Sequence, residues 1–369
     1  MKLEHLPENW RDVLTASEGV KPSPSNIARL GKQFGEDVAS WAFTQWEIRG
    51  RAASKFSRAS EMLFTRPGYE MATSERVAEF HASLFPPGVH VHDLTCGIGA
   101  DLIALAGRGP AVGIDLSPIH VECARHNLDV YGVSASVELN DALIAGAGAK
   151  YVFVDPARRD ERKRTVNPEE FSPSFSALEP ILRGAELAVM KISPMVDDRW
   201  LDGVEAQVIV VSYEFGCPEI LLVFGQGAGR SVVRVESGSR LTPIGLAQTV
   251  DEPAQYLYEA DAAVIRGGAL GAIGLPGLAD SNGYLTSDER VGSEWVRGFE
   301  VLWHGAWRPK DVTAAARKLD GQIEVVKTRG VRVSPAEAKA QVKAVGPRRL
   351  TLVLYRLGEK VRACLVEPL

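Results

Sequence analysis

The sequence predicts an α/β fold in which a parallel β-sheet is covered by helices on both faces. Three observations lead to this prediction. Strand-like and helix-like segments alternate between residues 89 and 190, as they do in consecutive β-α-β units. A loop with two glycines follows the first of these strands, and an aspartate stands at or near the end of each of the first four. The chain has 369 residues, enough for two or three domains.

The first 70 residues are predicted to be mostly helical. A helix is expected over Val38–Arg51, with its tryptophan and phenylalanine side chains packed inward. Another helix is expected after Thr73-Ser74-Glu75, because these residues supply an N-cap and an early acidic side chain. It ends at Pro86-Pro87-Gly88, where the prolines stop a helix.

The elements of the parallel sheet follow. Short β-branched and apolar runs mark its strands, and longer segments with apolar residues at helical spacing mark the helices between them. The expected strands are Val89–Leu94, Ala111–Ile114, Ala135–Leu139, Tyr151–Val154 and Glu186–Met190, and the expected helices are Ala100–Ala106, Pro118–Tyr131, a short one after Asp141, and Pro173–Leu182.

A hairpin is expected next, because Gln207–Val211 and Ile220–Phe224 are apolar runs joined by a glycine-containing connection. We expect it to close one edge of the sheet. Residues 225–229, Gly-Gln-Gly-Ala-Gly, mark a domain boundary. Beyond the boundary, Ser231–Val235 and Ala254–Tyr258 are strand-like, and residues 267–283 are too rich in glycine to assign.

The last part of the chain predicts a small α+β module that ends in a hairpin. Four parts are therefore expected: a helical N-terminal region (1–70), the sheet domain (71–225), a small α+β linker domain (226–295) and a C-terminal α+β domain (296–369). The expected elements of the last part are Phe299–Trp303, Pro309–Lys318, Ile323–Lys327, Pro335–Val345, Leu350–Tyr355 and Val361–Val366, of which the second and fourth are helices.

The composition is that of a soluble globular protein, with 45% hydrophobic and 24% charged residues. No apolar run reaches the roughly 18 residues that cross a bilayer, so no membrane segment is expected. The start of the chain lacks the basic-then-apolar layout of a signal peptide. The four cysteines, Cys96, Cys123, Cys217 and Cys364, lack metal-ligand spacing. We expect free thiols, a cytoplasmic protein and no metal site.

The charge is distributed unevenly. Residues 305–369 hold 14 Lys and Arg against 6 Asp and Glu, a net charge of +8. The rest of the chain holds 28 against 41, a net charge of −13, which returns the overall −5. A basic segment on an acidic body indicates an anionic partner. The alternative is that these lysines and arginines only solvate the surface of the module.

The loop after the first strand reads Asp93-Leu-Thr-Cys-Gly97-Ile-Gly99-Ala-Asp101. Its glycines let the backbone approach a ligand, and the helix that follows offers unpaired N–H groups. A dinucleotide site requires a third glycine, but Leu102 occupies that position. This departure argues against NAD or FAD. Cys96 is interpreted as a small packing residue of the loop.

Three further acids follow later strands. Asp115 stands 18 residues after Gly97, where an acid accepts hydrogen bonds from ribose hydroxyls. Asp141 either accepts from an adenine amine or caps a helix. Asp155 follows the fourth strand, which is expected to lie beside the first, so Asp93 and Asp155 flank one cleft. Two carboxylates at adjacent strand ends are rarely a packing device, because burying them unpaired is costly.

These four sites, taken in order, resemble the motifs of the class I S-adenosylmethionine (SAM)-dependent methyltransferases over about residues 71–225. The segments Ala124-Arg125-His126-Asn127 and Val130-Tyr131-Gly132-Val133 resemble RNA-directed members, notably trimethylguanosine synthases. Phe64-Thr65-Arg66, Ala72-Thr73-Ser74, Asp155-Pro-Ala-Arg-Arg159 and the basic end resemble a narrower bacterial group that carries a C-terminal THUMP-like domain. That resemblance covers essentially the full chain. It implies a Rossmann-like class I methyltransferase sheet with a helical N-terminal region and small α+β C-terminal domains.

The resemblance also implies roles for individual residues. SAM is the expected cofactor. The expected cofactor-binding residues are Thr73, Asp93, Cys96, Gly97, Gly99, Asp101, Asp115, Leu116, Asp141, Ala142 and Asp155. The expected catalytic residues are Asp155, Pro156 and Arg158, and the expected substrate-binding residues are Arg159, Arg162, Lys163 and Lys191.

One departure from the family concerns the catalytic motif. Methyltransferases of guanine and adenine amines carry D/N-P-P-Y/F, whose aromatic ring stacks on the flipped base. Here Ala157 and Arg158 replace the last two residues. Arg158 is expected to stack through its guanidinium plane or to grip a phosphate. The basic run from Arg158 to Arg164 either binds an RNA backbone or is a solvated loop, and Lys191 either orients the substrate or extends to solvent.

The expected function is transfer of a methyl group from SAM to a base in tRNA or rRNA, which the basic C-terminal module presents. Two alternatives remain: an RNA-binding protein with an inactive SAM-binding domain, and a methyltransferase of small molecules or proteins. A covalent mechanism through Cys217 is disfavoured, because this residue lies in the hairpin turn and not beside the fourth strand. The sequence does not indicate an oligomeric state.

Overall fold

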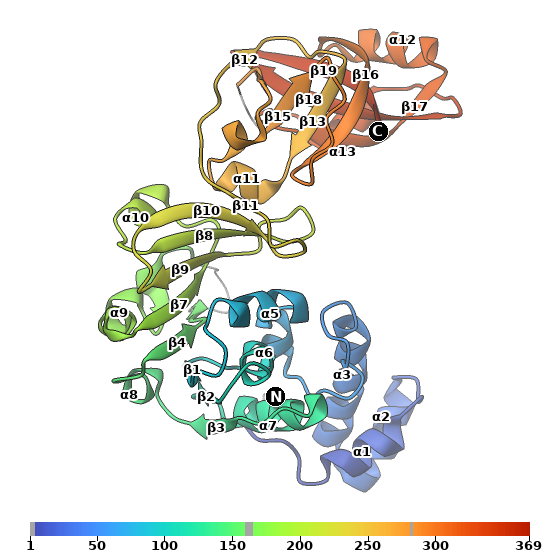
Figure 1. Cartoon of the computed structure of the whole chain (residues 1–369). Helices are drawn as coiled ribbons and strands as arrows, with labels where there is room; N and C mark the ends of the chain where they lie inside the picture. The colour runs from blue at the N-terminus through green and yellow to red at the C-terminus, as the bar shows by residue number, and fades with distance from the viewer. Residues whose placement is uncertain (1–3, 159–164, 281–282) are drawn as a thin grey trace. The chain divides into compact units, whose positions relative to one another are not determined.

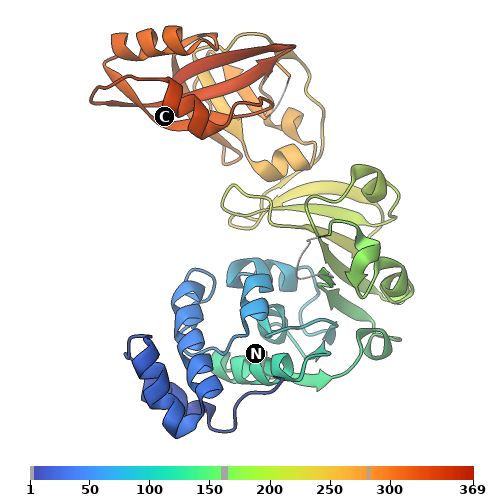
Figure 2. The same cartoon turned by 180° about the vertical axis from the view of Figure 1, so that it is seen from behind.

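The structure, a computed structural model, describes residues 4–158, 165–280 and 283–369. The chain divides into two compact units, whose elements are labelled in Figure 1 and seen from behind in Figure 2. The first unit comprises Met1–Val208 and Ile220–Gly229, and the second comprises Ile209–Glu219 and Arg230–Leu369. Within the described ranges, no helix combines the length and the apolar character that crossing a membrane requires.

The first unit begins with helices, as expected. Ser23 caps the second of them through the backbone N–H of Asn26, and Gly35, with φ of 95°, turns the chain into the third. These helices share a core with the sheet domain, in which Ala42 and Ile48 belong to the same buried cluster as Ile98. The helices are α1 (Trp10–Ser17), α2 (Pro24–Phe34), α3 (Glu36–Ala52), α4 (Arg66–Met71) and α5 (Glu75–Ser83).

The expected split between residues 1–70 and 71–225 therefore differs from the structure. The N-terminal helices bury their apolar side chains against α6 (Ala100–Ala106) and α7 (Pro118–Tyr131). Hydrophobic burial makes the two ranges one folding unit, because the helices have no separate core large enough to stand alone.

The larger sheet has nine strands in the order β11-β10-β8-β9-β7-β4-β1-β2-β3. β1 pairs in parallel with β2 and with β4, and β4 pairs in parallel with β7. β9 pairs antiparallel with β7. The strands are β1 (Val91–Asp93), β2 (Ala111–Asp115), β3 (Ser136–Leu139), β4 (Tyr151–Val154), β7 (Leu187–Ile192), β8 (Gln207–Ser212), β9 (Ile220–Phe224), β10 (Gly229–Arg234) and β11 (Arg240–Leu241).

This order confirms the α/β prediction and corrects one detail. The expected hairpin is formed by β8 and β9, but it does not close the edge of the sheet, because β10 and β11 extend the order beyond β8. The chain runs from β1 outward to β3 and then returns to β4 on the other side of β1. The carboxyl ends of β1 and β4 thus form the switch point at which α/β sheets bind ligands.

The connections between these strands include α8 (Ala142–Ala145), α9 (Phe175–Gly184) and α10 (Asp198–Asp202). Pro118 begins α7, where the N–H that proline lacks has no helical partner in any case. After β4, the short strands β5 (Ala157–Arg158) and β6 (Phe171–Ser172) pair with each other, and a 3-10 turn (Pro168–Glu170) precedes β6. The sequence pattern did not predict these two-residue strands.

The second unit contains an eight-stranded sheet in the order β12-β14-β15-β13-β16-β19-β18-β17. We expected separate domains over 226–295 and 296–369, but one sheet spans both ranges, because β13 pairs antiparallel with β16 from Tyr256↔Glu300 to Ala260↔Val296. The strands are β12 (Thr249–Val250), β13 (Tyr256–Ala260), β14 (Gly277–Leu278), β15 (Tyr284–Ser287), β16 (Val296–Ala306), β17 (Gly321–Thr328), β18 (Arg348–Leu357) and β19 (Lys360–Pro368).

The helical elements of the second unit are α11 (Ala262–Arg266), a 3-10 turn (Leu270–Ile273), α12 (Pro309–Lys318) and α13 (Pro335–Gln341). Ser334 and Glu337 form a capping box at the start of α13. Val312 and Ala316 of α12 and Ala338 of α13 are buried in one core with Leu352 of β18. The predicted order of strands and helices after residue 296 is thus confirmed, and the last two strands form the expected hairpin.

Candidate active site

The ends of β1 and β4 bring two of the predicted acids together. The two strands are paired in parallel, with Asp93 opposite Phe153, and Asp155 follows two residues later. The hydroxyl of Thr95 accepts a hydrogen bond of 2.8 Å from the backbone N–H of Asp155. This bond fixes the turn after β4 to the loop after β1. The expectation that Asp93 and Asp155 lie at neighbouring strand ends is confirmed.

Asp93 is almost completely buried, with 1% of its surface exposed. One carboxylate oxygen, Oδ1, accepts from the backbone N–H of Thr95 at 3.3 Å. The other, Oδ2, has no hydrogen-bond partner among the described residues. Burial and the negative charge of nearby Asp101 raise the pKa of Asp93 well above its usual value. A buried acceptor without a partner is costly and indicates a place where a ligand completes the site.

The loop from Cys96 to Gly99 contains two glycines in the left-handed region. Gly97 has a φ of 53°, and the space around its Cα is open where a side chain would project. Gly99 has a φ of 89°, and a Cβ there would lie 3.2 Å from that of Ala124. Leu102, at the position of the missing third glycine, is fully buried. The loop is therefore shaped for backbone contact with a ligand, and α6 packs without a third glycine.

Asp115 is held at the end of β2 by the loop itself. Its Oδ2 accepts from the backbone N–H of Gly97 at 3.0 Å, and its Oδ1 accepts from that of Ser117 at 2.7 Å. The ring of His120 lies 3.4 Å from Oδ1. Leu116, the next residue, is 68% exposed. The pair offers a fixed carboxylate beside an exposed apolar surface.

Asp141 stands at the end of β3. Its Oδ1 accepts from the backbone N–H of Leu143 at 2.7 Å and so caps α8, and Ala142 is buried behind it. The sequence allowed Asp141 to cap a helix or to accept from an adenine amine. Both roles are compatible with the structure, because one carboxylate oxygen caps α8 and the other can accept from a ligand. The structure supports the cap directly.

Four further side chains form a hydrogen-bonded network that ends at Asp155. The oxygens of Asp101 accept from His81 Nδ1 at 2.7 Å and from the hydroxyl of Thr73 at 2.8 Å. Lys191 Nζ donates to Thr73 Oγ1 at 3.0 Å and to Asp155 Oδ2 at 2.7 Å. The polar atoms of Thr73 and Asp101, which we expected to contact a cofactor, bond to each other and to neighbouring side chains, and their contact with a cofactor stays a prediction. Lys191, expected to contact the substrate, pairs with Asp155.

Four aspartates of the described residues gather at this site. Asp93, Asp101, Asp115 and Asp155 lie close enough that each of the other three raises the pKa of Asp93 after burial has done so. Lys191 supplies a cation within the network and is paired with Asp155. A cluster with more carboxylates than cations suits a positively charged ligand.

The chain resembles known proteins over most of its length. A family model described as THUMP domain-like matches residues 296–368, and one described as RNA cap guanine-N2 methyltransferase matches residues 89–150. An uncharacterised SAM-dependent methyltransferase of Mycobacterium tuberculosis strain H37Rv is 31% identical over 344 residues, which cover 88% of this chain and 95% of that protein. The corresponding protein of strain CDC 1551 / Oshkosh gives the same values. The chain belongs to the SAM-dependent methyltransferases.

The fold of this methyltransferase is also found in a solved structure. The crystal structure of a candidate methyltransferase from Porphyromonas gingivalis W83 matches it with a TM-score of 0.77 and covers 98% of both chains. The sequence identity is 19%, so this likeness concerns the fold. The class I methyltransferase architecture with a THUMP-like C-terminal module, which the sequence motifs suggested, is confirmed.

The residues at the strand ends fit SAM, the cofactor of this family. The unpartnered Oδ2 of Asp93 offers an acceptor to a cationic ligand, and the open space at Gly97 leaves room beside the backbone. Asp115 holds a carboxylate in a fixed position, which would suit a ribose, and Leu116 exposes an apolar surface beside it, which would suit a purine. A ligand with a positive sulfur and an ammonium group also offsets the excess of carboxylates.

The predicted substrate contacts are described only in part. Pro156 is buried, and the backbone of Arg158 pairs with Phe171 in the short β5–β6 sheet. Arg159, Arg162 and Lys163 lie outside the described residues, as does the side chain of Arg158. Their expected roles in gripping RNA stay predictions.

Cysteine chemistry finds no support in the structure. Burial raises the pKa of the Cys217 thiol to about 12, and burial followed by the charge of Asp93 raises that of Cys96 well above its usual value. Both thiols stay protonated at neutral pH, so neither is a ready nucleophile. In the residues that the structure describes, no group of His, Cys, Asp and Glu has the arrangement of a metal site.

Sequence reasoning missed two residues of the site. Thr95 lies within the motif loop, but no pattern shows that its hydroxyl reaches Asp155. His81 lies on α5, separated from Asp101 by 20 residues, and is fully buried. Helical periodicity marks His81 only as an inward position, where a core side chain is the ordinary interpretation.

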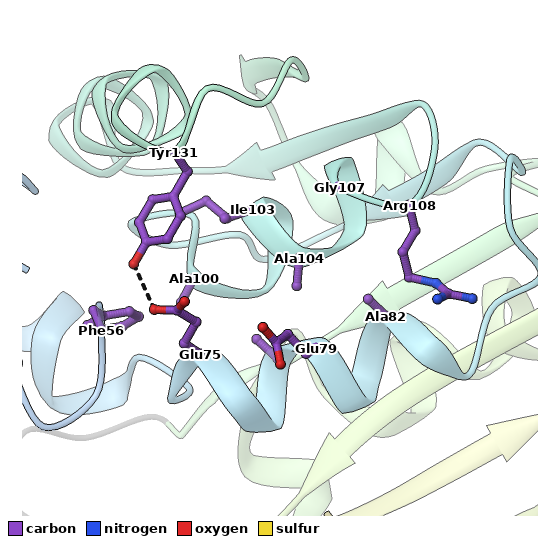
Figure 3. A pocket seen from close by; sticks show the side chains of 11 residues that line it. Phe56, Glu75, Glu79, Ala82, Ala100, Ile103, Ala104, Gly107, Arg108 and Tyr131 are labelled. Carbon is purple, nitrogen blue, oxygen red and sulfur yellow. Dashed lines mark hydrogen bonds between the residues drawn. The ribbon is translucent and has the colours of Figure 1, made fainter. Parts of the chain in front are cut away.

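A pocket of about 330 Å³ lies apart from the strand ends. Figure 3 shows Glu75, Glu79 and Ala82 on one helix facing Ala100, Ile103 and Ala104 on another. The carboxylate of Glu75 accepts from the hydroxyl of Tyr131 at 2.9 Å and from Ser57. None of the expected cofactor-binding acids lines this pocket. The unpartnered acceptor and the carboxylates that would suit the cofactor lie at the strand ends and not in the lining of this pocket.

Proposed function

We propose that this methyltransferase modifies a nucleotide base in RNA, either tRNA or rRNA. The observation that carries the proposal is the basic module at residues 296–368, which matches the THUMP-like family and occurs in the same chain as a SAM-dependent methyltransferase domain. A positively charged protein surface binds the phosphates of RNA. This electrostatic attraction supplies a large part of the binding affinity.

The basic side chains of the module are not all neutralised within it. Arg348 pairs with Glu367 and Arg349 with Glu324. By contrast, Lys310, Lys318 and Lys343 are exposed and form no ion pair with a described residue. Arg317 of α12 donates to the carbonyl of Lys343 at 3.0 Å, which brings the end of α12 beside the segment after α13. Lys310, Lys318 and Lys343, called here the α12–α13 lysines, are the proposed phosphate contacts.

The reaction needs little from the protein beyond positioning. SAM supplies a methyl group that its positive sulfur makes electrophilic. The protein holds the target atom in line with that group, which removes much of the entropic cost. The carboxylate of Asp155, or the carbonyl of Pro156, accepts a hydrogen bond from the target and helps remove its proton. Arg158 holds the base or a phosphate beside them, and Arg159, Arg162 and Lys163 contact the RNA backbone.

The proposed cofactor contacts divide by the part of the ligand. Gly97 and Gly99 approach it with their backbone, and Cys96 provides the small side chain that the loop requires. Asp93 accepts from its cationic end, Asp115 and Leu116 hold the ribose and the purine, and Asp141 with Ala142 borders the purine. Thr73 and Asp101 border the cofactor site without a hydrogen bond to the cofactor, since their polar atoms are bonded to each other.

The test compares the modified nucleosides in RNA from cells with and without the gene. One methylated nucleoside is expected to disappear from tRNA or rRNA. Wild-type protein with SAM restores it in vitro, and Asp155→Asn does not. Unchanged nucleosides in every RNA fraction, with methyl transfer to a protein or small-molecule fraction instead, contradict the proposal. SAM binding without transfer to any fraction indicates the inactive SAM-binding alternative.

A further inference from the structure

We propose that His81 is a positioning residue of the methyl-transfer site, which holds Lys191 against Asp155 through Asp101 and Thr73. The inference deepens the proposed function and rests on it, because Asp155 is the proposed acceptor. His81, Asp101, Thr73 and Lys191 are called here the His81 network. They come from α5, the segment before α5, the start of α6 and the end of β7.

The first contact joins His81 to Asp101. The two side chains are buried, with the His81 ring fully inaccessible, and Nδ1 lies 2.7 Å from Asp101 Oδ1. The ring also lies against Phe153 of β4, with ring centroids 5.3 Å apart. Burial alone would raise the pKa of Asp101, but the charge and hydrogen bond of His81, together with the charge of Lys191 and the hydrogen bond of Thr73, lower it below its usual value. Asp101 is thereby kept as an ionised acceptor inside the protein.

The second contact passes from Asp101 to Lys191 through one hydroxyl. Thr73 donates its proton to Asp101 Oδ2 at 2.8 Å and accepts from Lys191 Nζ at 3.0 Å. A hydroxyl has one proton, so the ionised Asp101 determines its direction and turns its lone pairs toward Lys191. The backbone next to Thr73 is fixed as well, because Lys55 Nζ donates to the carbonyls of Ala72 and Tyr69.

The third contact places Lys191 on Asp155. Nζ lies 2.7 Å from Asp155 Oδ2, and the lysine side chain is 13% exposed. Among the described residues, Lys191 therefore has fixed acceptors on two separate elements, and both help to hold its ammonium group in place. The ammonium group of Lys191 in turn holds one oxygen of Asp155, which orients the carboxylate toward a target atom.

A core role alone does not explain this composition. Histidine, aspartate and lysine are expensive to bury, and apolar side chains of similar volume fill such a space at no electrostatic cost. A buried polar network, by contrast, can hold its side chains in a single arrangement, because a member that moves leaves a neighbour without a hydrogen-bond partner. The network ends at the carboxylate proposed to accept the proton, which is where a fixed arrangement affects rate.

The experiment uses matched pairs of variants of the full-length protein. Thr73→Val removes the hydroxyl at constant shape, and Thr73→Ser keeps it. His81→Leu removes the donor to Asp101, and His81→Asn keeps a donor near the position of Nδ1. Glu79→Gln, on the same helix and paired at the surface with Arg76, is the control. Thermal denaturation establishes that each variant is folded.

Two readouts are measured. The first is the rate at which acetic anhydride labels Lys191, followed by mass spectrometry, with exposed Lys150 as the internal reference. It requires no RNA and no activity. The second is the single-turnover rate of methyl transfer to RNA at saturating SAM, together with SAM affinity by calorimetry.

The proposal predicts that Thr73→Val and His81→Leu raise labelling of Lys191 and slow methyl transfer, each by about tenfold, the equivalent of one hydrogen bond to a charged group. SAM affinity, the serine and asparagine variants and Glu79→Gln stay close to wild type. Unchanged labelling in Thr73→Val overturns the proposal, and so does a serine variant as impaired as the valine variant. If His81→Leu does not fold, the Thr73 pair decides. If the wild-type protein methylates no RNA, the proposed function is wrong. The labelling of Lys191 then still tests whether the His81 network holds this lysine in place.

Discussion

Lys191 stands on β7 and Asp155 directly follows the neighbouring parallel strand β4, and their charged groups are 2.7 Å apart. The pair lies at the switch point of the sheet, beside buried Asp93. Asp155 is 30% exposed and Lys191 13%, so the pair is partly shielded from water. This arrangement gives the proposed acceptor a fixed orientation and suggests four substitutions that test the site.

Replacement of Lys191 by methionine is expected to slow methyl transfer by about 10–100-fold, because Asp155 loses the group that orients it. Methionine keeps most of the length and apolar volume of lysine. Lys191→Arg keeps the charge and is expected to recover part of the rate. Single-turnover kinetics at saturating SAM measures the effect, and a Lys191→Met protein with the wild-type rate contradicts the orienting role.

Asp93→Asn is expected to stabilise the protein at neutral pH. The pKa of Asp93 is raised in the folded state by burial, so folding disfavours the ionised form. Asp93 therefore destabilises the folded wild-type protein as it ionises. This effect is absent below the ordinary aspartate pKa of about 3.9 and grows as pH rises above it. Asparagine avoids the cost of an unpaired buried charge, about 1–3 kcal/mol. Thermal denaturation of wild type and variant from pH 4 to pH 8 measures the difference, which is expected to widen with pH.

The same substitution is expected to weaken SAM binding. A cationic ligand favours ionised Asp93, so wild-type affinity increases as pH rises through the raised pKa of this residue. The asparagine side chain of the Asp93→Asn variant cannot ionise, so the affinity of the variant loses this pH dependence. Calorimetric titration with SAM at several pH values tests the claim. Equal pH dependence in the two proteins shows that Asp93 does not sense the ligand charge.

Asp115→Asn is expected to weaken SAM and S-adenosylhomocysteine equally, by about tenfold, because both carry the same ribose and each loses a hydrogen bond to a charged acceptor. Asp129→Asn, on the exposed face of α7, is the control for removal of one charge. If Asp115→Asn loses affinity for SAM but not for S-adenosylhomocysteine, Asp115 interacts with the sulfonium and not with the ribose.

The α12–α13 lysines are expected to govern the salt dependence of RNA binding. Each lysine changed to glutamine is expected to lower the slope of log affinity against log salt by about one phosphate contact. Lys32→Gln, on exposed α2 of the other unit, provides the matched charge control. Filter binding of tRNA between low and physiological salt gives the slopes, and the wild-type slope in all three lysine variants contradicts a role for these lysines.

Local patterns predicted the sheet domain well. The boundaries of α6, α7, β4 and α12 agree with the sequence expectation, since proline or a glycine turn marks where several of these elements begin. The acids at the strand ends were also predictable, because parallel strands direct their carboxyl ends to one edge. The positions of Asp93, Asp115, Asp141 and Asp155 follow from this rule.

Contacts between distant segments could not be predicted in the same way. The pairing of β13 with β16 joins residues some 40 positions apart, and it merges two expected domains into one sheet. The hydrogen bond between His81 and Asp101 depends on how α5 packs on α6. Periodicity reports which face of an element is buried, and it does not report which side chain lies opposite.

The most direct test of the central claim is the activity of Asp155→Ala with SAM bound. The account predicts that methyl transfer to RNA falls to background in single-turnover assays, while calorimetry gives SAM binding close to that of wild type. An Asp155→Ala protein that binds SAM and transfers methyl groups at the wild-type rate would contradict the assignment of Asp155 as the acceptor.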